Sequence, residues 1–119
     1  MGAINCKVII AMLTVVLALA VGQLLFKATA MAWAADGTLF STRVLTRLFP
    51  SLVVYGLATL AWIWVLQTVP LRTAYPFMAL AFAFVPIGAY LIFKEVITPV
   101  YWVGTFFIVV GVVITAIAR

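Results

Sequence analysis

The chain is poor in the residue types from which most catalytic and metal sites are built. Its 119 residues include one cysteine, no histidine and only two carboxylates, Asp36 and Glu95. A single thiol excludes an intrachain disulfide, and without histidine a Cys/His metal cluster is excluded too. We therefore expect no metal, no cofactor and no enzyme activity.

Charge of either sign is also scarce. Charged residues make up 8% of the sequence and hydrophobic residues 69%, with a mean hydropathy of +1.39. A soluble domain of this size has nowhere to put so much apolar surface, so the composition predicts an integral membrane protein. The net charge of +5 comes from basic residues scattered near the expected helix ends. Such residues are typical of interfacial anchors, and we expect a lipid bilayer rather than nucleic acid as the partner.

Long apolar runs are what the sequence does contain. A helix of about 20 residues crosses a hydrocarbon core of about 30 Å. The runs predict an all-α protein with four transmembrane helices, one domain over residues 1–119, with spans at about 8–34, 52–69, 73–93 and 100–118. A cleaved signal peptide is the alternative for the first run, because Lys7, the apolar stretch and the Ala18-Leu19-Ala20 segment imitate its three regions. The sequence retains Met1, which favours a membrane helix that carries Lys27 inside it.

The connection over residues 37–51 permits two interpretations. Apolar residues alternate there with Arg43 and Arg47, one helical turn apart, after Ser41 and Thr42 as possible caps. This pattern is typical of a short amphipathic helix on the membrane surface. It equally fits a helical extension of the second span.

The stretch from Gln67 to Glu95 organises the rest of the chain, because its helix contains two prolines. Each proline removes a backbone donor, and a bilayer tolerates the freed carbonyl only where a neighbouring helix or a hydrated cavity satisfies it. This helix is therefore expected to line a cavity. Pro86, with Gly88 just beyond it, is expected to bend the helix near Phe82 and to act as a hinge.

The last span is expected to bind a partner chain. Thr98 is a suitable N-cap and Pro99 a suitable first helical residue. Gly104 and Gly111 share one face with Ile108 between them, and small residues let membrane helices approach closely. We predict a dimer, homo or hetero, through this face.

Basic residues do not decide the orientation. With four spans, each membrane side carries three of them, before Lys27 is assigned: Lys7, Arg72 and Arg119 on one side, and Arg43, Arg47 and Lys94 on the other. This balance gives no decision by the positive-inside rule. It permits an antiparallel dimer without requiring one.

Four stretches in this order resemble a known family. They are VGQLLFKATA (21–30), TLAWIWVLQTVPLRTAYPFMAL (59–80), FKEVITPVYWVG (93–104) and IVVGVVI (108–114). The whole chain resembles the small four-helix members of the drug/metabolite transporter superfamily. Within it, the chain is more similar to the subunits of the undecaprenyl-phosphate-aminoarabinose flippase than to the small multidrug resistance exporters.

One departure from the exporters is informative. They carry a membrane-embedded glutamate one turn before the glycine that here is Gly22, and this chain has Leu19 there. Without a buried carboxylate, a cationic substrate has no counter-charge and a proton relay has no carboxylate. Gln23 and Lys27 follow Leu19 at one-turn spacing and make the same stripe neutral and positive, which suits an anionic ligand.

The resemblance implies a transporter in the bacterial inner membrane that flips a polyprenyl-phosphate-linked sugar, alone or as one subunit of a dimer. Lys27 and Arg72 would bind the phosphate, Gln23 and Tyr75 would form neutral hydrogen bonds, and Trp62 would stack on the sugar. The expected lining residues are Gln23, Lys27, Trp62, Arg72, Tyr75 and Met78. The alternatives are a small exporter of cationic solutes or metabolites and a structural subunit that only pairs with a larger enzyme. For Lys27 itself, the alternative is an interfacial anchor.

Overall fold

A computed structural model of the chain describes residues 6–118, which leaves Arg119 outside the described residues. The described part folds into the helices α1 (Cys6–Asp36), α2 (Thr42–Leu66), α3 (Leu71–Met78), α4 (Ala81–Phe93) and α5 (Pro99–Ile117), and it contains no strand. Because α3 and α4 together form one membrane crossing, four helical segments are long and apolar enough to span a bilayer. The predicted all-α, four-helix membrane architecture is confirmed.

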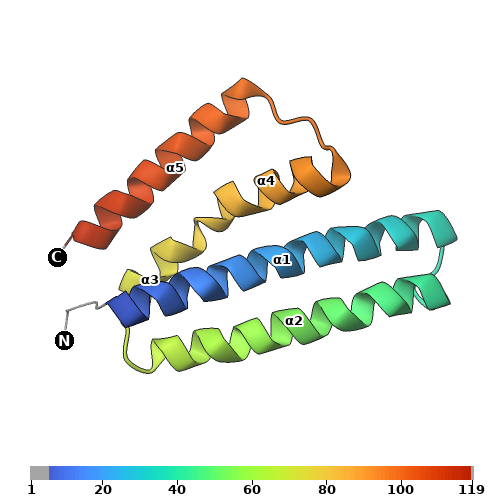
Figure 1. Cartoon of the computed structure of the whole chain (residues 1–119), viewed down its shortest axis with the longest axis horizontal. Coiled ribbons are helices and arrows are strands. Elements are labelled where there is room, and N and C mark those ends of the chain that lie inside the picture. The colour runs from blue at the N-terminus through green and yellow to red at the C-terminus, as the bar shows by residue number, and fades with distance from the viewer. Residues whose placement is uncertain (1–5, 119) are drawn as a thin grey trace.

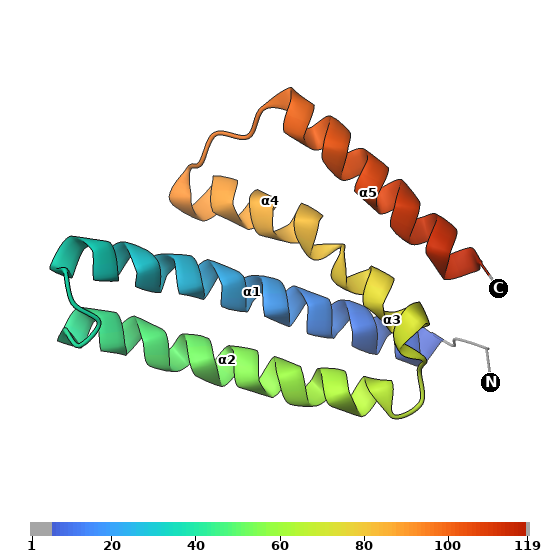
Figure 2. The same ribbon diagram turned by 180° about the vertical axis from the view of Figure 1, so that it is seen from behind.

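Helix α1 lies in the middle of the structure. It runs antiparallel to α2 on one side and faces α3 and α4 on the other, while α5 lies outside α3 and α4 (Figure 1). The view from behind shows the same order (Figure 2). In the most apolar part of each span, 33% of α1 is buried but only 11% of α5. The α1–α2 hairpin therefore forms the core, and α5 leaves most of its apolar surface to lipid or to another chain.

The second helix begins ten residues earlier than the predicted span. It starts at Thr42, and the Ser41 hydroxyl caps it by accepting a hydrogen bond from the Val44 amide at 3.1 Å. The extension interpretation of residues 37–51 is thus confirmed, and a separate surface helix is wrong. Pro50 lies inside this helix, because losing one backbone donor does not end a helix that packs along a neighbour.

The third membrane crossing is broken, whereas the sequence predicted one helix over 73–93. Helix α3 ends at Met78 and α4 begins at Ala81. Between them the hydrogen bonds tighten by one residue, since the Phe82 amide donates to Ala79 and the Ala83 amide to Leu80, both at 2.9 Å. The Pro86 ring crowds the carbonyl four residues before it, and the turn ahead of that carbonyl tightens.

Two glycines allow neighbouring helices to approach α1 closely. A Cβ at Gly22 would lie 2.8 Å from Cδ1 of Tyr55 on α2. A Cβ at Gly88, on α4, would come still closer to Cδ1 of Leu24 on α1. Both distances are shorter than real carbon contacts, so a side chain at either position would force the Tyr55 ring or the end of Leu24 to move.

The Gly22→Ala variant is expected to lower the free energy of unfolding by about 1 to 3 kcal/mol, because an overpacked core must shift the Tyr55 ring. Gly56→Ala is the matched control, since a Cβ at Gly56 meets nothing within 4 Å. Both variants gain the same helix propensity, so their difference reports the clash alone. Circular dichroism during denaturant titration in mild detergent measures it. Equal stability of the two variants would contradict the close α1–α2 contact.

The N-cap of the last helix is as predicted. The Thr98 side chain accepts a hydrogen bond from the Tyr101 amide at 3.3 Å, and Pro99 is the first residue of α5. This cap sets where α5 begins. The loop that starts at Lys94 connects α4 to α5 on the side of the molecule where α1 ends (Figure 1).

Candidate functional site

Gln23 and Lys27 lie on one flank of the central helix. Gly22 faces α2 and Leu24 faces α4, as their close contacts show. Successive residues on a helix are about 100° apart, so Gln23 points between α2 and α4. Lys27 follows one turn later on the same side, and both side chains are exposed within the single chain. The structure thus gives α1 a polar flank, defined by Gln23 and Lys27.

A helix of the length of α1, centred on the bilayer, carries Lys27 within the depth of the hydrocarbon. Helix α1 has 31 residues. At a rise of 1.5 Å per residue it is about 46 Å long, enough for a bilayer with its headgroup regions. Lys27 is then about 13 Å from Asp36, or about 6 Å inside the hydrocarbon edge. Helical side chains tilt toward the helix N-terminus, which here directs the Lys27 stem toward the bilayer centre and away from the nearer surface.

A second cation lies at the same level, and the sequence did not predict it as a site residue. The Arg47 guanidinium donates a hydrogen bond to the carbonyl oxygen of Ala28, next to Lys27, at 3.3 Å. One turn further along α2, the Ser51 hydroxyl lies 3.3 Å from that of Thr29 in the buried α1–α2 contact. The one-turn spacing of Arg43 and Arg47 was the available signal, but the contact with α1 spans 19 residues of sequence.

The Asp36 carboxylate interacts mainly with Arg43, and its charge also attracts Arg47 at longer range. Asp36 forms an ion pair with Arg43 and accepts a hydrogen bond from Ser41 at 2.7 Å. Within residues 6–118, neither Lys27 nor Arg47 has a carboxylate oxygen within 4.0 Å. This end of the molecule therefore has a positive excess beside the polar flank of α1.

The other predicted lining residues lie elsewhere. Trp62 and Met78 are half-buried and pack against the cluster of Val15, Leu19 and Ala58, with Trp62 also touching a second cluster nearer the start of α1. Tyr75 is 62% exposed on α3.

Arg72 is exposed in the first turn of α3, at the end where α1 begins (Figure 2). Lys27 is 20 residues along α1 from Lys7, which is about 30 Å. Within one chain the structure therefore does not bring Arg72 to Lys27. The two cations lie near opposite membrane surfaces.

Leu19, at the position of the exporters' carboxylate, is buried. It is only 7% exposed and packs with Val15 and Ala58 between α1 and α2. Of the three residues at one-turn spacing, Leu19 is therefore buried between α1 and α2, whereas Gln23 and Lys27 lie on the exposed polar flank.

The predicted interface residues on α5 are uncovered within the chain, whereas the predicted hinge residues on α4 are packed. A Cβ at Gly104 or at Gly111 meets nothing within 4 Å, so no described part of the same chain covers this side of α5. Ile108, between them, is half-exposed. Pro86 is buried within α4, and Gly88 is the glycine that packs on Leu24.

Comparison with known proteins shows what this chain is similar to. A stretch of 64 residues, 54% of this chain, is 44% identical to the probable 4-amino-4-deoxy-L-arabinose-phosphoundecaprenol flippase subunit ArnE of Enterobacter sp. (strain 638), of which it covers 60%. The subunit of the same name in Shigella flexneri is 41% identical over 54% of this chain and 58% of its own length. The chain thus spans less than two thirds of these curated relatives in the matched stretch.

A third relative extends the match. The protein of the same name in Proteus mirabilis (strain HI4320) is 29% identical over 103 residues, which are 87% of this chain and 91% of that protein. No family model and no solved structure matches. The predicted resemblance to the flippase subunits is confirmed, and the chain is a multi-pass membrane protein similar to them.

Proposed function

We propose that this chain is a transporter subunit that moves a polyprenyl-phosphate-linked sugar, or a related anionic lipid, between the leaflets of the bacterial inner membrane. In this proposal residues 1–119 form one four-helix domain, and the protein transports rather than catalyses. The named relatives support the substrate class, since each is described as a subunit of a flippase for an aminoarabinose-phosphoundecaprenol.

One observation carries the proposal. Lys27 precedes Ala28, whose carbonyl accepts from Arg47, and among residues 6–118 no carboxylate oxygen lies within 4.0 Å of either cation. A lysine costs about 2.5 to 3.5 kcal/mol at the centre of a membrane helix and less toward the edge where Lys27 lies, and an ionisable residue within a span is normally paired or functional. A phosphate crossing the bilayer supplies the missing anion.

In this proposal the predicted lining residues form two phosphate-binding positions, one near each membrane surface. Lys27 with Gln23 binds the phosphate near one surface, and Arg72 with Tyr75 binds it near the other. Trp62 and Met78 lie between these ends and offer an aromatic face and an adaptable apolar surface to the sugar. The polyprenyl tail stays in lipid throughout.

Four helices of this size enclose little volume, so we propose that the pathway forms between two chains. The partner is a second copy or a related four-helix subunit, and it packs on the Gly104, Ile108 and Gly111 face of α5. Helix α5 supports this because it is little covered within its own chain.

The double variant Gly104→Leu with Gly111→Leu is expected to reduce dimer yield several-fold. Neither leucine would clash within its own chain, but both would keep the backbone of a partner helix from approaching closely. Crosslinking in native membranes measures it. Gly56→Leu is the control, since a Cβ at Gly56, on α2, also meets nothing within 4 Å. An unchanged dimer yield in the double variant would show that this face is not the interface.

We also propose that the proline-containing crossing flexes during transport, at Pro86 or at the tightened turn just before it. Pro86→Ala restores one backbone donor and stiffens α4. The variant is expected to fold normally, by circular dichroism, and to transport more slowly. Transport at the wild-type rate would mean that the bend only shapes packing.

Ligand binding separates this proposal from a cation exporter. Purified protein in detergent is expected to bind undecaprenyl phosphate saturably and to show no saturable binding of tetraphenylphosphonium. The reason is that Asp36 and Glu95, the only side-chain carboxylates, lie at a helix end and in a loop. Binding of tetraphenylphosphonium but not of the polyprenyl phosphate would reverse the assignment.

A further inference from the structure

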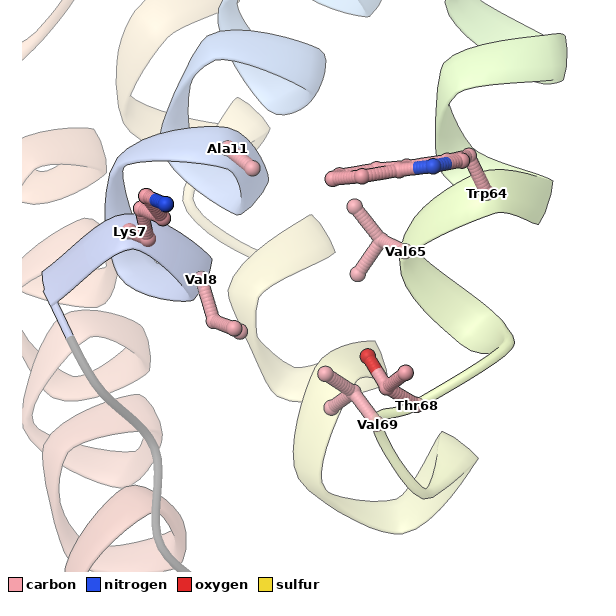
Figure 3. Close-up of a pocket in the computed structure, with 7 residues that line it drawn as sticks. All are labelled: Lys7, Val8, Ala11, Trp64, Val65, Thr68 and Val69. Atoms are coloured by element: carbon pink, nitrogen blue, oxygen red, sulfur yellow. The ribbon is translucent and has the colours of Figure 1, made fainter.

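A pocket of about 130 Å³ lies between the first turns of α1 and the end of α2, far from Lys27. Its walls come from α1, from α2 and from the turn that leads to α3: Lys7, Val8, Ala11, Trp64, Val65, Thr68 and Val69. In Figure 3 the Trp64 ring extends from α2 toward Ala11, and Lys7 lies on the opposite wall. Arg72 follows three residues after Val69, so a further cation begins α3 at this end.

The two polar side chains of this pocket, Lys7 and Thr68, differ in their surroundings from similar groups elsewhere in the described part of the chain. Six other threonines, at 14, 29, 46, 59, 105 and 115, donate their hydroxyl to a carbonyl in the preceding turn of their own helix. Thr68 lies just beyond α2, and within residues 6–118 its hydroxyl has no hydrogen-bond partner. The Lys7 ammonium has no carboxylate within 4.0 Å in the same range. A cation, a hydroxyl and an exposed indole thus border one space.

The remaining walls are apolar. Val8, Ala11, Val65 and Val69 form them, and Val65 and Val69 belong to a buried cluster that fixes their positions. A site with a cation and a hydroxyl above a valine surface suits an amphiphile whose charged head adjoins a hydrocarbon chain. Trp64, 64% exposed, presents its ring to a sugar or to the first isoprene unit.

We propose that this pocket is a second headgroup site, at the membrane surface opposite Lys27, that binds the phosphate of an isoprenoid lipid through Lys7 and Thr68. Trp64 covers the group attached to that phosphate, and the first isoprene unit lies on the valines. The inference rests on the proposed function, because it adds a holding site for the lipid at the surface where Arg72 and Tyr75 are proposed to meet the phosphate. Phosphate is the shared chemistry of a lipid headgroup and free inorganic phosphate, and the attached chain distinguishes them.

The test is equilibrium lipid retention in detergent, measured by native mass spectrometry on the full chain with any co-purified partner. The probes are undecaprenyl phosphate, phosphatidylglycerol and inorganic phosphate, added separately. Wild type is expected to retain a second undecaprenyl phosphate in addition to the one bound at Lys27, and the double variant Lys7→Gln with Thr68→Val is expected to retain this second lipid at least about tenfold more weakly, since it loses a charged and a neutral hydrogen bond. Lys94→Gln removes one exposed cation at the other end and is expected to bind like wild type.

Each other result overturns the proposal in a recognisable way. If wild type and the double variant fold normally and retain the lipid equally, the pocket does not bind it. The flippase proposal is then unaffected. Equal competition by phosphatidylglycerol makes it a general lipid contact, and equal competition by inorganic phosphate makes it an anion site without lipid selectivity. Absence of any binding of undecaprenyl phosphate to wild type contradicts the proposed function itself.

Discussion

Lys27→Gln is expected to weaken binding of undecaprenyl phosphate about 10- to 100-fold, because a hydrogen bond to a charged group contributes about 1.5 to 3 kcal/mol and 1.4 kcal/mol is a factor of ten. Lys27→Arg keeps the charge and is expected to retain partial activity, since its planar guanidinium places the donors differently. Lys27→Glu repels the phosphate and is expected to abolish transport. Affinity in detergent and transport in vesicles both measure the series.

The competing account is that Lys27 anchors α1 at the membrane surface. Against it, the Lys27 stem tilts toward the bilayer centre, away from the nearer surface. The neighbouring Ala28 carbonyl already accepts from Arg47, so a cation is held at this level without Lys27. If all three variants insert and transport alike once expression is matched, the anchor account is right and the binding account is not.

Leu19→Glu is expected to destabilise the protein by about 3 to 5 kcal/mol, the cost of leaving a buried charge without a partner. Leu19 is 7% exposed and packs with Val15 and Ala58 in the α1–α2 contact. Leu19→Met, which conserves volume, is expected to cost less than about 1.5 kcal/mol. Thermal unfolding of both variants in detergent measures the difference.

This variant also tests the exporter alternative. In the exporters that the chain resembles, a carboxylate at this position faces the substrate. If Leu19→Glu folds as stably as Leu19→Met and acquires saturable binding of tetraphenylphosphonium, the Leu19 face lines a cation cavity. That result would contradict the packing of α1 against α2.

The sequence predicted the number and the type of helices because the bilayer fixes the length of an apolar run. It also predicted the Thr98 cap, since a threonine before a proline at a helix start satisfies local backbone donors. It left open whether residues 37–51 form a surface helix or extend the second span, and the structure shows the extension, from Thr42. Packing along α1 decides between them, because α2 continues as a helix through Pro50.

Only part of the candidate site followed from spacing. One-turn spacing placed Gln23 and Lys27 on one flank, which local helix geometry determines. The hydrogen bond from Arg47 on α2 to Ala28 on α1 joins residues that are 19 apart in sequence. Local spacing cannot predict a contact of this range. The sequence also did not predict that Lys27 and Arg72 lie at opposite ends of the molecule. Their separation depends on the length of α1 between them.

The most direct measurement is the rate at which a fluorescently labelled undecaprenyl phosphate crosses the bilayer of a proteoliposome, read with a membrane-impermeant quencher. The protein is purified by a tag from its native membrane, so that any bound partner is retained. The account predicts crossing well above that in protein-free vesicles for wild type, an intermediate rate for Lys27→Arg, and the protein-free rate for Lys27→Glu. Wild-type crossing at the protein-free rate, or Lys27→Glu crossing as fast as wild type, would contradict it.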